Sequence, residues 1–443
     1  MAQKNFILKN NLINFFFIFF LFSHIYLWDL QNIIDSAGKL DFNSTFLRYL
    51  ILIFLLNFFL QKKFSIKFFF DLNILIFSLI FLTKFFINTF IYGQFLNLKE
   101  VSSIVFFFLL YFVVKNEKEK IIDNLKLIFE IFITINFLST IYFLFVGKFS
   151  IGAACNLFLV DSIIFHENSH YAMMTTSIIV FYLYLKKNTR NIIFLSLIIF
   201  SSLMNLSLTF VISIIISLVF CIIVNLFYKK KNNLWFLIFL IIFSVLLVSN
   251  NNCKNRINYL SQKTFYDQKL YFAKENKKEI IKENSYQYLQ SSQNTSSKVY
   301  NIAILNTIYT FKNRAFGWGF NSYERLFNKN IMDIMKNYYQ IEYEKSLLEN
   351  KQFPPMVLNT NDARSTLLKI LNEFGIFSLF FLYAGFKFIL NKKVELYLKM
   401  TIISLLITQL ISGAGYFNGG FSIFLFLMLL LNQRNLINNR FSK

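Results

Sequence analysis

Cysteine, histidine and proline are scarce in this sequence of 443 residues, which contains 3 Cys, 3 His and 2 Pro. The cysteines, Cys155, Cys221 and Cys253, show no paired spacing, so the sequence predicts neither a disulfide framework nor a metal site built on thiolates. Cys221 lies inside an apolar run, where a thiol acts as a small hydrophobic group. These absences argue against a disulfide-rich secreted protein and against a zinc domain.

Charged residues are also few, at 15% of the chain, whereas 56% of the residues are hydrophobic and 61 are Phe. A soluble domain could not hide so much apolar surface in one core. The short basic N-terminus continues into apolar sequence without a small-residue cleavage site, which favours a retained first span over a signal peptide. The composition therefore predicts a membrane protein.

Apolar runs of a length that can cross about 30 Å of hydrocarbon as a helix recur along the chain. Nine of them precede a long polar stretch, near 9–28, 45–61, 66–90, 99–114, 124–147, 169–185, 191–207, 209–228 and 234–249. Three more follow, near 366–390, 395–412 and 417–432. The predicted fold is all-α, a polytopic transmembrane bundle of about twelve spans.

Basic clusters predict the orientation of this bundle. The formal net charge is +22, but the Lys and Arg residues lie in short clusters between apolar runs and not on one amphipathic face, so nucleic acid is not an expected partner. Cytoplasmic loops retain Lys and Arg, and every second loop is basic if twelve spans are counted. Both termini are then cytoplasmic and the polar stretch is external. Three regions follow: an N-terminal bundle at 1–249, a large, partly helical external loop at 250–365, and C-terminal spans at 366–443.

Two of the three histidines lie in one segment at the external start of the sixth predicted span. His166, Glu167 and His170 cluster there if Asn168 or Ser169 caps the helix, within reach of a substrate at the membrane surface. The alternative interpretation is an interfacial polar cap.

The external loop contains a glycine-rich aromatic turn. Gly317 and Gly319 flank Trp318, which allows a ligand to approach the backbone, and Arg314 and Arg325 offer forked donors suited to phosphate. Trp318 and Tyr323 are candidates for stacking on a sugar. A simple aromatic turn is the alternative.

The loop re-enters the membrane through Asp362, Arg364 and Ser365, and Glu373 follows about two turns into the next span. A carboxylate inside a span is costly, so we expect Glu373 to face protein or a cavity. Arg48 and Lys84, near the ends of the second and third spans, are either snorkelling residues or site residues. The last external turn, 413–420, contains Tyr416 among four glycines, which could merely allow close packing.

Taken in order, these four segments resemble the O-antigen polymerase and O-antigen ligase superfamily of bacterial envelope glycosyltransferases. The similar stretches are Glu-Asn-Ser-His-x-Ala at 167–172, Gly-Trp-Gly-Phe-Asn-Ser-Tyr at 317–323, Asn-Asp-Ala-Arg-Ser at 361–365 with Glu-Phe-Gly at 373–375, and Gly-Ala-Gly-Tyr-Phe-Asn-Gly-Gly at 413–420. The ligase branch usually has a His where this chain has Arg364, and this departure favours the polymerase branch.

The resemblance implies a GT-C-like enzyme that joins undecaprenyl-diphosphate-linked oligosaccharide units at the outer face of the bacterial inner membrane. In that interpretation Arg314 and Arg364 bind diphosphate, and Glu167 or His170 activates or orients the acceptor. The expected substrate-binding residues are His166, Gly317, Trp318, Gly319, Tyr323, Asp362, Ser365, Glu373 and Tyr416. No Asp-x-Asp pair occurs in an external loop, so no metal and no cofactor are expected. Membrane lipid, a chain-length regulator and a flippase are the expected partners.

Three other functions remain open. An O-antigen ligase would transfer the glycan to lipid A core. A different class of glycosyltransferase would use Asp29, Asp35 and Asp41 of the first external loop. A lipid-linked sugar flippase or other transporter usually has paired halves or charged, broken spans, and this chain shows no internal repeat.

Overall fold

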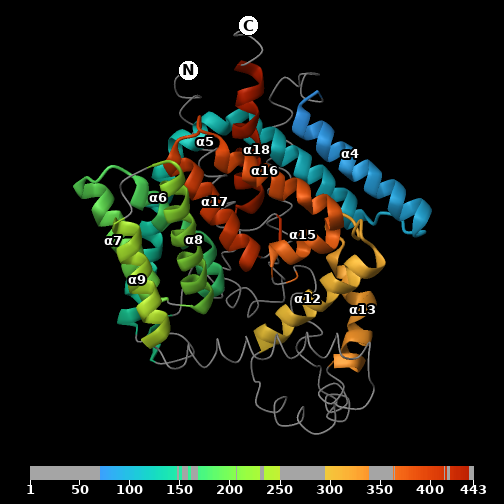
Figure 1. Cartoon of the computed structure of the whole chain (residues 1–443). Helices are drawn as coiled ribbons and strands as arrows, with labels where there is room; N and C mark the ends of the chain where they lie inside the picture. The colour runs from blue at the N-terminus through green and yellow to red at the C-terminus, as the bar shows by residue number, and fades with distance from the viewer. Residues whose placement is uncertain are drawn as a thin grey trace, which may run out of the picture.

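The structure is a computed structural model of the whole chain. The structure describes residues 70–146, 149–151, 158–160, 168–205, 207–229, 234–249, 295–338, 363, 365–413, 415–416 and 420–438. The first two predicted spans, 9–28 and 45–61, and residues 250–294, 339–362 and 364 of the predicted external loop fall outside these residues. Figure 1 shows a helical bundle with α12 and α13 at one end of it.

The elements before the large loop are α4 (Leu72–Phe86), the π-helix η2 (Ile87–Ile91), α5 (Leu98–Phe145), strands β1 (Phe149–Ile151) and β2 (Phe158–Val160), α6 (Asn168–Tyr184), α7 (Thr189–Met204), α8 (Leu208–Phe227) and α9 (Leu234–Ser249). The two strands pair antiparallel, with Ser150 opposite Leu159. The later elements are α12 (Thr295–Asn313), α13 (Tyr323–Tyr338), α15 (Thr366–Phe374), the 3-10 helix η4 (Gly375–Ser378), α16 (Leu379–Leu390), α17 (Leu396–Ile411) and α18 (Phe421–Asn438).

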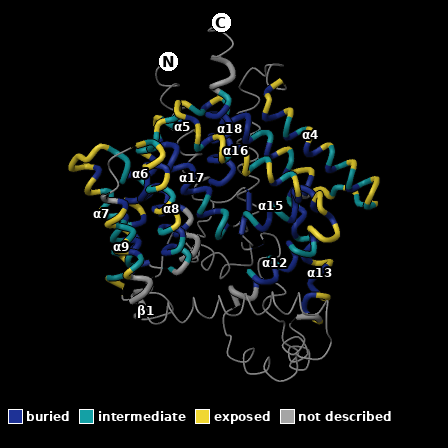
Figure 2. Tube along the Cα trace, in the orientation of Figure 1, coloured by how far each residue is buried: buried dark blue, intermediate teal, exposed yellow. Residues whose placement is uncertain are grey.

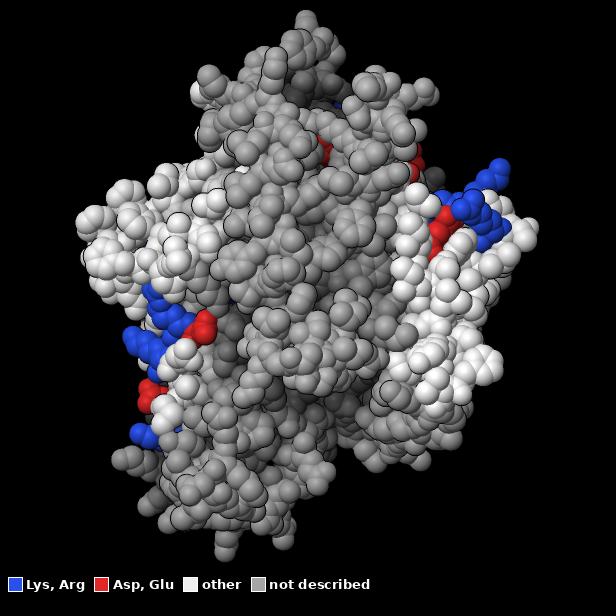
Figure 3. Space-filling model, turned by 180° about the vertical axis from the view of Figure 1, so that it is seen from behind, with Lys and Arg blue, Asp and Glu red and all other residues white. Residues whose placement is uncertain are grey.

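Four helical segments of the described chain are long and apolar enough to cross a membrane, Leu72–Ile91, Glu100–Phe145, Thr209–Phe227 and Thr366–Leu390. Large apolar side chains lie exposed on them, such as Leu79 on α4 and Phe386 on α16. In Figure 3 most of the visible charged side chains gather in two groups at opposite margins, and most of the other described surface in that view is uncharged. These apolar helices indicate a membrane protein.

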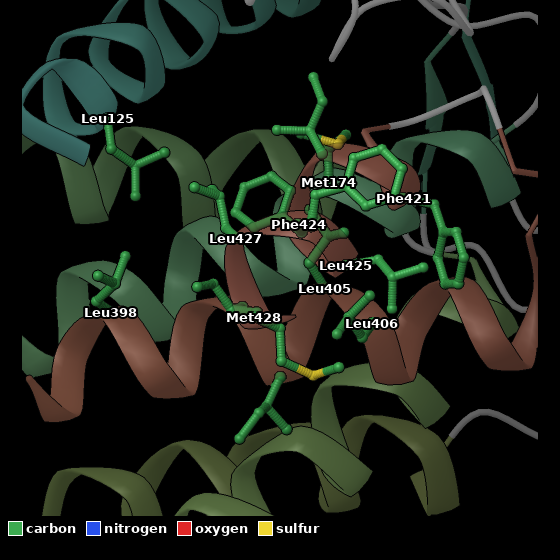
Figure 4. Packing of buried hydrophobic residues seen from close by; sticks show 14 of the residues in the cluster. Leu125, Met174, Leu398, Leu405, Leu406, Phe421, Phe424, Leu425, Leu427 and Met428 are labelled. Carbon is green, nitrogen blue, oxygen red and sulfur yellow. The ribbon is translucent and has the colours of Figure 1, made fainter. Parts of the chain in front are cut away.

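Helix α18 lies in the interior of the bundle, and its residues 421–432 are all buried (Figure 2). Its apolar side chains meet those of α5, α16 and α17, and Figure 4 shows Phe424, Leu427 and Met428 of α18 beside Leu405 and Leu406 of α17. Fully burying a leucine or phenylalanine side chain contributes about 1.5–3 kcal/mol relative to water. The last predicted span is therefore the central packing element.

The largest departure from the sequence prediction is α5. The runs 99–114 and 124–147 were expected to be two spans joined by a basic loop, but one helix of 48 residues covers both. No Gly or Pro interrupts this stretch, and its polar middle consists of strong helix formers. The Lys120–Glu117 ion pair at 2.8 Å, three residues apart, also suits a helix. The halves pack on different neighbours: Phe107 contacts Phe77 and Phe426, whereas Phe129 contacts Phe181.

A single proline substitution in the polar middle of α5 can test whether the helix is continuous. We expect Glu119→Pro to lower the free energy of unfolding by about 3 kcal/mol, because proline removes a hydrogen bond and clashes with the preceding turn. The Glu119 side chain is 62% exposed, so Glu119→Ala should stay within about 0.5 kcal/mol of the natural protein. Chemical denaturation of the purified protein in detergent would measure both. Equal stability of the two variants would mean that 115–120 is the loop the sequence predicted.

Candidate functional site

The site is built around a backbone interlock between the α12–α13 connection and the end of α15. The Trp318 N–H donates to the Asn372 carbonyl at 3.0 Å, the Gly319 N–H donates to the Glu373 carbonyl at 3.0 Å, and the Ile376 N–H donates to the Ala315 carbonyl at 2.9 Å. Gly317 and Gly375 have φ values of +77° and +54°, which L side chains rarely adopt. A Cβ on Gly375 would lie 2.1 Å from the Ala315 carbonyl oxygen, so only glycine fits.

Glu373 lies at the centre of this interlock and is fully buried. Its carboxylate accepts hydrogen bonds from the Asn321 N–H at 2.7 Å, the Tyr323 N–H at 3.0 Å and the Tyr416 hydroxyl at 2.7 Å. Tyr323 is the first residue of α13 and Asn321 lies just before it, so the helix dipole favours a negative charge at that position. The prediction that Glu373 faces protein is confirmed, and the carboxylate caps a helix from another segment of the chain.

Ser365 and Asn372 dock α15 on its neighbours. The Ser365 hydroxyl caps α15 by accepting from the Leu368 N–H at 3.3 Å, and it donates to the Leu410 carbonyl near the end of α17 at 2.6 Å. The Asn372 amide bonds the Thr307 and Thr310 hydroxyls of α12 at 2.7 and 2.8 Å. The hydrogen bonds of these polar side chains hold the described part of the large loop onto the bundle.

Arg314 is a cationic residue that the loop contributes to this site. Its side chain is 7% exposed; the guanidinium carbon lies 4.0 Å from the Tyr92 ring centroid and 3.8 Å from that of Trp318. An Arg314 Nη1–H donates to Gln94 Oε1 at 2.8 Å. Burial lowers the pKa of the guanidinium from its ordinary value, but a group with so high a pKa stays charged at neutral pH. Arg325 is instead paired with Glu100 at 2.8 Å.

Two lysine side chains lie close to Glu373, and Arg314 lies close to one of them. Lys84 of α4 donates to the Glu373 backbone carbonyl. Lys369 donates to Asn321 Oδ1 at 3.1 Å and lies 5.3 Å from the Tyr416 ring centroid. Each lysine attracts the Glu373 carboxylate electrostatically, and Lys84 is also repelled by the Arg314 guanidinium. Among the described residues of this cluster, positive charge therefore exceeds negative charge, which favours an anionic ligand.

Two predicted roles are wrong in this arrangement. Trp318 and Tyr323 were expected to stack on a sugar, but they are 2% and 1% exposed. Both rings pack in the apolar cluster under α12 and α13, with Leu326 and Phe327 among its members. Their aromatic surface is already used to hold the loop together, because burying it is more favourable than leaving it in water.

The structure brings together seven of the predicted site residues: Arg314, Gly317, Trp318, Gly319, Tyr323, Glu373 and Tyr416. Ser365 lies at the other end of α15, where it contacts α17. His166, Glu167, Asp362 and Arg364 fall outside the described residues. His170 lies in the first turn of α6, although its side chain is not described. Phe181, late in α6, contacts Tyr397 at the start of α17, so the start of α6 lies at the end of α17 that leads to 413–420.

Sequence reasoning missed the contribution of α4 and the segment after it. Lys84 was left undecided between snorkelling and a site role, while Asn88, Tyr92 and Gln94 were not considered. Lys369 was also missed, although its position four residues before Glu373 places both side chains on one face of a helix. No spacing signal links α4 to the loop, because the hydrogen bond from the Asn88 amide to the Trp318 carbonyl, at 2.8 Å, spans 230 residues.

No protein-family model, no curated protein and no solved structure matches this chain. The likeness to the O-antigen polymerases therefore rests on the four sequence segments and their order.

Proposed function

We propose that the protein is a membrane glycosyltransferase that polymerises undecaprenyl-diphosphate-linked oligosaccharide units into O-antigen or a related surface polysaccharide. One observation carries this proposal. Three of the four sequence segments with polymerase-like motifs, around Trp318, Glu373 and Tyr416, are joined by direct hydrogen bonds beside the buried guanidinium of Arg314. Contact between segments from distant parts of the sequence supports one shared site, because unrelated turns would have no reason to meet.

The proposed reaction forms a bond between an acceptor sugar hydroxyl oxygen and the anomeric carbon of the donor sugar. The bond from that carbon to the diphosphate oxygen breaks, and undecaprenyl diphosphate leaves with the electron pair. Arg314 and Arg364 neutralise the charge that develops on the leaving group. Glu167 or His170 takes the hydroxyl proton. Glu373 accepts three protein donors already, so we assign it and Tyr416 to positioning the loop.

In this proposal the chain lies in the bacterial inner membrane with about twelve spans, the two halves of α5 counting as two of them, with both termini in the cytoplasm and the large loop in the periplasm. The proposed reaction uses no metal and no cofactor. A flippase that delivers the donor and a chain-length regulator are the proposed partners.

Reconstitution with an undecaprenyl-diphosphate-linked repeat unit tests the function. Chain growth in proteoliposomes is the expected result. Transfer to lipid A core would instead identify a ligase, and translocation without new glycosidic bonds would identify a transporter. If Asp29→Asn or Asp35→Asn abolished polymer while Arg364→Ala did not, the site would lie in the first external loop.

The Arg314 guanidinium provides a second test. We expect Arg314→Lys to lower kcat/KM for chain growth by at least about 100-fold, as loss of a transition-state donor does. Lysine keeps the charge but lacks the planar fork that contacts both rings and Gln94. The matched control is Arg190→Lys, which alters an arginine paired with Glu130 at the start of α7. Equal rates for the two variants would remove Arg314 from the site.

A further inference from the structure

The end of α4 changes from an α-helix to a π-helix, η2, before the chain turns at Gly93. The Tyr92 N–H donates to the Ile87 carbonyl at 3.3 Å, five residues earlier. Such single wide turns inside α-helices occur frequently at functional sites. No Gly or Pro lies within 84–92 to force the irregular turn, so its cause is to be sought in tertiary contacts.

Two side chains anchor this end of α4 to the backbone interlock. Lys84 donates to the Glu373 carbonyl and the Asn88 amide donates to the Trp318 carbonyl at 2.8 Å. Their exposed fractions are only 4% and 3%. A snorkelling lysine would reach water, so Lys84 does not act in that way. Both donors end on carbonyls of the segments that Gly317 and Gly375 bring together.

Beyond the wide turn, the chain contacts the Arg314 guanidinium directly. Tyr92 contributes a ring at 4.0 Å, and Gln94 accepts a hydrogen bond at 2.8 Å. The Gln94 N–H also donates to the Asn88 carbonyl at 2.8 Å, which folds this segment back on the anchored turn. With Trp318 at 3.8 Å, these contacts restrict the guanidinium to one orientation.

We infer that the π-helical end of α4 is a positioning element of the site, which orients Arg314 for a diphosphate-like anion through Tyr92 and Gln94. A π-turn accommodates one extra residue, so the residues after it are rotated by about 100° relative to an uninterrupted α-helix. Without that extra residue Tyr92 and Gln94 would turn away from Arg314. The positioning rests on the geometry around Arg314, and only the nature of the natural anion rests on the proposed function.

Binding of inorganic pyrophosphate to the full-length protein in nanodiscs tests this inference. Trp318 contacts Arg314, so its fluorescence can report the titration once the other two tryptophans, Trp28 and Trp235, are replaced by Phe. We expect Tyr92→Leu to raise the Kd for pyrophosphate at least tenfold. Tyr92→Phe keeps the ring and should stay within twofold of the parent protein. Deleting Thr89 should weaken binding at least as much as Tyr92→Leu.

The matched control is Tyr228→Leu, which removes a ring that lies 4.4 Å from the Lys399 ammonium, outside this site. It should leave the Kd for pyrophosphate unchanged. Tight binding by Tyr92→Leu would overturn the inference, and so would equal weakening by Tyr228→Leu or a parent protein that binds no pyrophosphate. If the variant with Thr89 deleted does not fold, the comparison of Tyr92→Leu with Tyr92→Phe still tests the inference.

Chain-growth kinetics separate this inference from the proposed function. For Tyr92→Leu we expect kcat/KM for the donor to fall at least tenfold and Tyr92→Phe to keep it within twofold of the parent protein, because a misoriented Arg314 stabilises the charge on the leaving diphosphate less well. If the variants show the expected Kd values for pyrophosphate but the parent protein gives no chain growth, the proposed polymerase function is wrong. The inference that the end of α4 positions Arg314 then still holds. Chain growth that Tyr92→Leu does not alter would refute the positioning element alone.

Discussion

Replacing Glu373 by Gln is expected to lower the free energy of unfolding by about 3 kcal/mol, within the range for breaking a buried charged network. The amide has the same shape, but its NH2 group would face a donor where a carboxylate oxygen now accepts. Lys84 and Lys369 would also lose the neighbouring negative charge. Chemical denaturation in detergent measures the difference.

Tyr416→Phe is the matched control for Glu373→Gln. It removes one of the three donors and keeps the ring, which stacks on Phe320 at 4.8 Å. The expected loss is about 1–2 kcal/mol, as for one hydrogen bond to a charged group. Glu373→Gln with no greater effect than Tyr416→Phe would show that the carboxylate is not ionised in the folded protein.

Replacing Gly375 by Ala should lower the free energy of unfolding by more than about 3 kcal/mol, because overpacking and an unfavourable φ act together. The new Cβ would meet the Ala315 carbonyl oxygen at 2.1 Å and the Gly317 nitrogen at 2.5 Å. Backbone atoms cannot move aside as a flexible side chain can. We expect the α12–α13 segment to detach from α15, which limited proteolysis would detect as new cleavage within 295–338.

Gly385→Ala is the control for Gly375→Ala, because nothing lies within 4 Å of a Cβ at that position in α16. Alanine is a better helix former than glycine, so stability should be unchanged or rise by up to about 1 kcal/mol. Gly317→Ala should act like Gly375→Ala, and the double variant should cost less than the sum because both changes break one contact. Additive losses in the free energy of unfolding would mean that Gly317 and Gly375 do not take part in the same contact.

The sequence predicted the described helices well where apolar runs end at polar or glycine residues. The runs near 169–185, 191–207, 209–228 and 234–249 correspond to α6, α7, α8 and α9 within a few residues. The α5 prediction failed because a basic cluster was taken as a loop. Charge predicts which side of a membrane a segment prefers, but it does not interrupt a helix made of Lys and Glu.

For the site, residue chemistry selected segments that the structure brings into contact, but it misassigned some roles. Glu373 was recognised because an ionisable group inside an apolar run needs partners. The buried positions of Trp318 and Tyr323 could not be predicted, because an aromatic ring suits a core as well as it suits a sugar-binding surface. Lys84 was ambiguous in the sequence for the same kind of reason, since a long side chain near a span end can reach water or protein.

By itself, the sequence determined that this chain is a helical membrane protein and that Glu373 must be satisfied by protein groups, since both follow from the cost of exposing apolar or burying charged groups. Only the tertiary structure decided that α4 meets the loop at Arg314, that Tyr416 donates to Glu373, and that two glycines interlock. Tertiary contacts such as the hydrogen bond from Lys84 to the Glu373 carbonyl join segments up to 289 residues apart. Local patterns constrain the conformation of each segment, whereas packing of the whole bundle selects which segments meet.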